Sequence, residues 1–237
     1  MSHPPRTATA DPAAPPAPPG SRGAQLLLAA FALAAITNLG SLLADLPLGH
    51  QLAKPLLMPL LAGYVLLSGG PRLLAAALLF GAGGDILLLF DAEPCFLAGM
   101  GSFALGHLCY LRLFLRGRRS TAADPSSRLR GLLLPAGYLL VLVAVVAVLW
   151  SGLPAALRGP VAGYSLLLTA MAWSATRFGP LAAAGGLLFL LSDTLIATGI
   201  ADLPQLPAHD FCVMLTYIAA QYALTRGVLN HRRVPTG

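Results

Sequence analysis

The chain has 237 residues, of which 57% are hydrophobic and only 10% are charged, and its formal net charge is +6. An ordinary soluble domain has about 25% charged residues, so the composition excludes a soluble globular domain. The positive charge does not indicate a nucleic-acid-binding protein, because the basic residues lie in short stretches between apolar segments, where membrane topology accounts for them.

The N-terminal residues 1–23 are rich in proline and alanine and show no apolar periodicity, which predicts a disordered tail. Eight apolar segments follow, each close to the roughly 20 residues that cross a bilayer as a helix. We expect membrane-spanning helices at 24–44, 52–68, 72–90, 95–115, 131–150, 159–176, 180–200 and 210–230. Proline or glycine marks most of the joints, and residues 231–237 form a short basic C-terminal tail. The expected fold is therefore an all-α integral membrane protein, a single eight-helix bundle over residues 24–230.

The arginines predict the orientation of this bundle. With eight spans both termini lie on one side of the membrane, and that side receives every arginine of the chain except Arg158. Loops rich in arginine face the cytoplasm, so we expect cytoplasmic termini and a multi-pass protein of the inner cell membrane.

Four ionisable residues stand out within the spans or at their mouths: Lys54, Asp85, His107 and Asp193. A charge inside the membrane costs roughly 2.5–3.5 kcal/mol on insertion scales, so such a side chain should face the bundle interior and have partners. Lys54 is the only lysine, which favours a specific ion pair with a buried carboxylate or a substrate phosphate, although a snorkelling lysine is the alternative. For His107 the alternative is a hydrogen-bonded structural histidine.

The rise of a helix per residue places several polar groups at one depth. Asn38, Lys54, Asp85, Asp193 and Tyr217 fall in one layer near the outer ends of five spans, and His107 lies deeper. Tyr217 and Gln221 share a helix face because they are four residues apart. For Asn38, Tyr217 and Gln221, hydrogen bonding between helices explains the positions as well as site chemistry does.

Five motifs in order carry a resemblance to a known family: "AKPLLMPLL", "GDILL", "FLAGMGSFALGHLCYL", "GGLLFLLSDTLIA" and "YIAAQYAL". Over about residues 30–228 the chain resembles the YhhN-like lysoplasmalogenases, a family of small eight-span membrane proteins. The resemblance implies an enzyme that hydrolyses the vinyl ether bond of a lysoplasmalogen, a lysophospholipid, to a fatty aldehyde and a glycerophospho-base. The polar positions that match are Lys54, Asp85, His107, Tyr110, Ser192, Asp193, Tyr217 and Gln221, whereas Asn38 rests on its depth alone. We expect no cofactor and no metal.

The expected chemistry uses both aspartates. Protonation of a vinyl ether carbon gives an oxocarbenium ion, as in glycosidases that work with two carboxyl groups. Asp193 is assigned as the general acid and Asp85 as the base or the cation stabiliser, although the two roles can be reversed. Lys54 then holds Asp85 or the lipid phosphate. The alternative function is a proton-coupled transporter of a small molecule or lipid with a buried Asp/Lys site, although the sequence shows neither an inverted repeat nor a broken helix pair.

Overall fold

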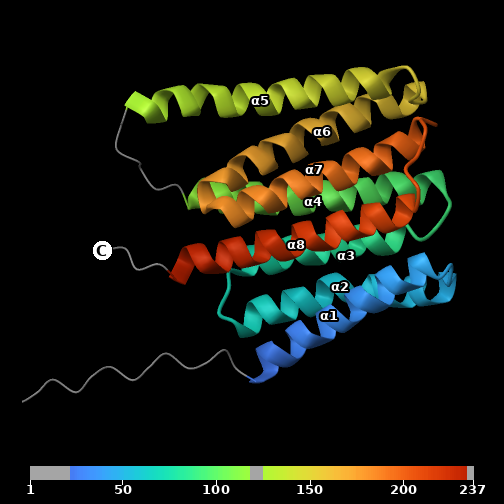
Figure 1. The fold of residues 1–237 in the computed structure, drawn as a ribbon, viewed down its shortest axis with the longest axis vertical. Coiled ribbons are helices and arrows are strands. Elements are labelled where there is room, and N and C mark those ends of the chain that lie inside the picture. The colour runs from blue at the N-terminus through green and yellow to red at the C-terminus, as the bar shows by residue number, and fades with distance from the viewer. Residues whose placement is uncertain (1–21, 118–124, 234–237) are drawn as a thin grey trace, which may run out of the picture.

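The computed structural model describes residues 22–117 and 125–233, and these residues form eight α-helices, one short 3-10 helix and no β-strand (Figure 1). The helices are α1 (Arg22–Leu43), α2 (Pro47–Leu67), α3 (Arg72–Leu87), α4 (Glu93–Arg116), α5 (Pro125–Trp150), α6 (Ala155–Ala175), η1 (Thr176–Phe178), α7 (Pro180–Ile200) and α8 (His209–Arg233). The predicted all-α fold and the number of long helices are confirmed for this part of the chain. Most of the predicted N-terminal tail lies outside the described residues, and α8 continues into residues that the sequence assigned to the C-terminal tail.

Proline explains several helix starts. Proline lies in the first turn of α2, α4 and α7, where its missing N–H leaves no hydrogen bond unmade. Pro71 and Pro154 are the N-cap residues of α3 and α6. The same ring is tolerated inside α2 at Pro55 and Pro59, so a proline in this chain does not always end a helix.

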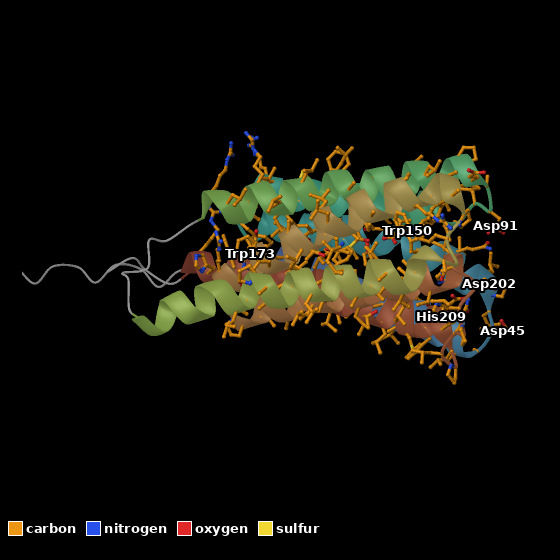
Figure 2. All side chains as sticks on the ribbon, turned by 90° about the horizontal axis from the view of Figure 1, so that it is seen from above. Asp45, Asp91, Trp150, Trp173, Asp202 and His209 are labelled. Atoms are coloured by element: carbon orange, nitrogen blue, oxygen red, sulfur yellow. The ribbon has the colours of Figure 1, made fainter. Side chains whose placement is uncertain are left out.

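The helices run side by side along one direction (Figure 1). α1 pairs with α2, α3 with α4, and α7 with α8, while α6 packs between α4 and α7. α5 lies at the edge of the bundle and packs mainly on α6. α1 begins and α8 ends at the same end of the bundle, on the left of Figure 1. Asp45, Asp91 and Asp202 lie at the opposite end, which we call the acidic end (Figure 2).

The surface is that of a multi-pass membrane protein. Five of the described helices are long and apolar enough to cross a bilayer, namely α1, α4, α5, α7 and α8. Large apolar side chains such as Leu26 (70% exposed), Ile36 (69%) and Leu140 (70%) lie on the outside, where lipid would surround them. α3 has only 16 residues, and α2 and α6 carry internal prolines and polar side chains. Membrane crossing by these three helices stays a prediction.

Close helix packing fixes the position of α7. A Cβ atom on Gly186 would lie 2.9 Å from the Cα of Ala172 in α6, and one on Gly185 would lie 2.8 Å from the backbone nitrogen of Leu224 in α8. Small residues allow helices to approach in this way inside membranes. Because α7 is held tightly between α6 and α8, the polar residues farther along α7 face the bundle interior at a defined height.

Candidate active site

A chain of hydrogen bonds between side chains ends at Asp85, which is only 2% exposed. The Tyr217 hydroxyl donates to Oδ2 of Asp85 at 2.8 Å, and Nε2 of Gln221 donates to the same hydroxyl at 3.4 Å. The Tyr110 hydroxyl in turn donates to Oε1 of Gln221 at 2.7 Å. Each group donates toward the carboxyl, and the chain links α3, α4 and α8. A Cβ atom on Gly81 would lie 3.1 Å from the Tyr217 hydroxyl, so this glycine provides the room for the arrangement.

A second chain of hydrogen bonds ends at Asp193. The Tyr164 hydroxyl donates to Oδ2 of Asp193, and Nε2 of His107 lies 3.0 Å from the same hydroxyl oxygen. Because the hydroxyl gives its proton to Asp193, the oxygen accepts one from His107, and the network assigns the Nε2–H tautomer to this histidine. The chain links α4, α6 and α7. Nδ1 of His107 has no hydrogen-bond partner among the described residues.

Aromatic rings connect the two chains. His107 and Tyr110 begin the two chains from one face of α4, since they are three residues apart. The Phe189 ring packs edge-on against His107 at 4.7 Å and against Tyr217 at 5.6 Å between ring centroids. Phe103 packs edge-on against Tyr217 at 5.9 Å. The two carboxyl groups thus flank one aromatic cluster.

The two aspartates and Lys54 also interact through their charges. Asp85 and Asp193 are close enough to interact through their charges, and the Lys54 ammonium interacts in the same way with Asp85. Lys54 is half-buried at the second turn of α2. The structure therefore brings Lys54, Asp85 and Asp193 into one electrostatic neighbourhood. That they form one catalytic site stays a prediction.

Asp193 faces an apolar pocket between α4, α5, α6 and α7. Most of the lining is aliphatic or aromatic, and Tyr164 and Asp193 bring polar atoms to the wall. Asp193 is accordingly only half-buried. Asp85 does not line this pocket, because Phe103, which does, lies against the Tyr217 ring that holds Asp85. The two acids therefore differ in access, and only Asp193 is open to a molecule in the apolar pocket.

Two predicted site residues have partners elsewhere. Nδ2 of Asn38 lies 3.1 Å from Nδ1 of His50, because α1 faces α2 at this height. The Ser192 hydroxyl donates to the backbone oxygen of Val213 at 3.1 Å and so ties α7 to α8. Neighbouring side chains on a helix diverge by about 100°, so Ser192 points away from the carboxyl group beside it in the sequence.

Sequence analysis missed Tyr164, the partner of Asp193. The signal was a single tyrosine in the apolar run "VAGYSLLL", since a buried tyrosine hydroxyl usually finds a hydrogen-bond partner. Among the described residues, no group of three or more His, Cys, Asp or Glu side chains is placed to hold a metal ion.

Comparisons with known proteins agree with the resemblance seen in the sequence. The family model that matches is described as the YhhN family, and it matches residues 49–228. The human lysoplasmalogenase TMEM86B is 35% identical over 183 residues, which cover 76% of this chain and 75% of the human protein. The rat lysoplasmalogenase TMEM86B is 32% identical over 75% of this chain and 71% of its own length. The bovine lysoplasmalogenase TMEM86A is 28% identical over 72% of this chain and 70% of its own length. No solved structure matches the chain significantly. From these matches we conclude that the chain belongs to the YhhN family.

Proposed function

We propose that the chain hydrolyses the vinyl ether bond of a lysoplasmalogen to a fatty aldehyde and a glycerophospho-base. The names of its relatives support this activity. The observation that carries the proposal is the position of Asp193, whose carboxyl group is hydrogen-bonded by Tyr164 at the wall of an apolar pocket. An alkenyl chain in that pocket would present its vinyl ether to a carboxyl group held in place.

The first step is protonation of carbon. The Tyr164 hydroxyl occupies Oδ2 of Asp193, which leaves Oδ1 to carry the acidic proton. Oδ1 gives this proton to the vinyl carbon farther from the ether oxygen, and the other vinyl carbon becomes part of an oxocarbenium ion. The carboxylate left on Asp193 and the nearby charge of Asp85 stabilise the cation.

The second step consumes one water molecule. Water attacks the oxocarbenium carbon and loses a proton to the Asp193 carboxylate, which restores the acid and forms a hemiacetal. The hemiacetal then collapses: its hydroxyl proton leaves, the bond to the glycerol oxygen breaks, and that oxygen receives a proton. Fatty aldehyde and glycerophospho-base are released, and Asp193 ends the cycle protonated.

Asp85 is assigned as the ionised member of the pair. It accepts the Tyr217 hydrogen bond and interacts with the Lys54 ammonium, and it lies behind Phe103 rather than in the apolar pocket. Asp85 therefore acts through its negative charge. The hydrogen-bonded chain of Tyr217, Gln221 and Tyr110 holds its carboxyl group in place. The neutral His107 supports the acid through Tyr164.

We propose further that the end of the bundle opposite the acidic end faces the cytoplasm of the cell that carries this protein in its inner membrane. α1 and α3 begin with arginine at that end, and α4 ends with arginine there. Arginine-rich loops are retained on the cytoplasmic side. Both aspartates then lie nearer the opposite face of the membrane.

The test is aldehyde release from an alkenyl-glycerophosphoethanolamine by the purified protein in detergent. We expect release by the wild type, loss of at least about 100-fold in Asp193→Asn, and normal release by Asp91→Asn, an exposed control on the acidic end. Size-exclusion profile and melting temperature check folding. Full activity in folded Asp193→Asn would overturn the mechanism. No release from folded wild type would overturn the function, and proton-coupled flux in vesicles would then favour a transporter.

A further inference from the structure

Arg158 is the exception in the charge pattern of this bundle. In the eight-span arrangement it is the one arginine on the side opposite the chain termini. It lies in the first turn of α6, just after the turn that follows Trp150 toward the acidic end (Figure 2). Arginine is depleted from loops on the side that is not cytoplasmic, so its presence at this end indicates a specific role. The mechanism proposed above does not use it.

Two contacts hold the Arg158 guanidinium in a defined position. Nε donates to the backbone oxygen of Leu153 at 3.2 Å, and the central guanidinium carbon lies 5.6 Å from the centre of the Trp150 ring, a stabilising cation–π distance. Within the described residues its two terminal NH2 groups have no hydrogen-bond partner, and no carboxylate is paired with it. A guanidinium has five N–H donors, so four of them are left for a ligand.

Arg158 extends the wall of the apolar pocket toward the acidic end. Val161 and Ser165 follow it by three and seven residues and therefore share its face of α6. Both of these residues line the apolar pocket. Leu149, the neighbour of Trp150 in α5, lines the same pocket. Arg158 thus lies at the outer rim of the cavity that Asp193 faces.

The spacing along α6 fits a lipid in that cavity. Arg158 precedes Tyr164, the residue that holds Asp193, by six residues, which is about 9 Å along the helix axis. In an alkenyl-glycerophospholipid, seven bonds join the phosphorus to the vinyl carbon that takes up the proton. An extended chain advances roughly 1.2 Å per bond, which gives about 8 Å. A lipid with its vinyl ether at Asp193 therefore reaches Arg158 with its phosphate.

We propose that Arg158 binds the phosphate of the lipid substrate at the outer rim of the apolar pocket. This inference rests on the proposed function, and it adds to that site a residue that belongs to neither hydrogen-bonded chain. The planar guanidinium presents paired N–H groups that match phosphate oxygens. Tryptophan is enriched at the membrane–water interface, so Trp150 places this arginine at the depth of lipid phosphates.

The alternative is that Arg158 only fixes the turn between α5 and α6. Gly152 in this turn lies so close to α7 that a Cβ atom there would be 2.2 Å from the backbone oxygen of Ala201. A structural role of this kind would affect every ligand of the apolar pocket equally. An arginine that binds phosphate affects only those ligands that carry one.

The test uses two saturated ether analogues of equal chain length, which have no vinyl bond to cleave: an alkyl-glycerophosphoethanolamine and an alkylglycerol without phosphate. Binding of each to the purified full chain is measured by calorimetry. We expect Arg158→Gln to bind the phosphate-containing analogue about tenfold more weakly, as for the loss of one hydrogen bond to a charged group. The alkylglycerol should bind as it does to wild type.

The matched control is Arg177→Gln, which removes an arginine stacked on Trp173 at 4.7 Å, toward the other end of the bundle (Figure 2). This control should bind both analogues like wild type. Arg158→Lys keeps the charge but loses the planar fork, so it should weaken only the phosphate-containing analogue, and by less than Arg158→Gln. It also provides the test if Arg158→Gln does not fold.

Two results would overturn the inference: unchanged binding of the phosphate-containing analogue by folded Arg158→Gln, or an equal loss for both analogues. Asp193→Asn separates this inference from the proposed function, because it should bind both analogues normally while it releases almost no aldehyde. Binding that depends on Arg158 in a wild type without turnover would leave the phosphate site standing and remove the hydrolase.

Discussion

Replacement of Tyr164 by phenylalanine tests the way in which the acid is held. The change removes one hydroxyl, which donates to Asp193 and accepts from His107, and it keeps the ring that packs 5.4 Å from the His107 ring. A hydrogen bond to a charged or ionising group contributes about 1.5–3 kcal/mol. If that stabilisation serves the transition state, then each 1.36 kcal/mol is a factor of about ten in rate, and kcat should fall about 10- to 100-fold.

The assay is initial-rate aldehyde release at saturating substrate, with Tyr222→Phe as the matched control. Tyr222 also loses only its hydroxyl, and its ring stacks on Phe31 at 6.4 Å outside both hydrogen-bonded chains. The control should keep wild-type kcat. KM should change little in Tyr164→Phe, because the hydroxyl holds Asp193 rather than the lipid. A folded Tyr164→Phe protein with wild-type kcat would refute the role assigned to this tyrosine.

Further substitutions test the rest of the site and its packing. Tyr217→Phe removes the donor to the buried Asp85, so we expect a loss of about 1–3 kcal/mol in the free energy of unfolding and a reduced kcat; unchanged values of both would contradict the assignment. Gly84→Ala places a methyl group into the Phe103 ring, and overpacking of this kind costs about 1–3 kcal/mol. Its control is Gly101→Ala, where a Cβ meets nothing within 4 Å. That change should raise the melting temperature, since alanine is the better helix former by roughly 0.5–1 kcal/mol; equal melting temperatures for the two variants would show that Gly84 has no packing role.

The helices could be predicted because apolar length and proline placement act locally. A run of about 20 apolar residues predicts a long helix whatever its neighbours are. The burial of Asp85 could also be predicted, because a carboxyl group in an apolar run is expected to face the bundle interior. The shared face of Tyr217 and Gln221 also follows from helical spacing, and the structure joins these two side chains directly.

Contacts between helices could not be predicted, because helical periodicity says nothing of which helix lies beside which. Tyr164 meets an aspartate 29 residues farther along the chain, and that pairing depends on how α6 and α7 are rotated about their axes. Asn38 was predicted to lie in the same layer as the two aspartates, but its side chain reaches His50 on the neighbouring helix α2. The access of each carboxyl group to the apolar pocket could not be predicted either. Asp193 lines this pocket, whereas Phe103 separates Asp85 from it.

Hydrolysis in heavy water, followed by mass spectrometry of the aldehyde, tests most directly whether Asp193 protonates a vinyl ether carbon. Wild-type protein should release aldehyde that carries one deuterium on the carbon next to the carbonyl group, and Asp193→Asn should release almost none. Aldehyde released without deuterium, or released at the wild-type rate by folded Asp193→Asn, would contradict the account.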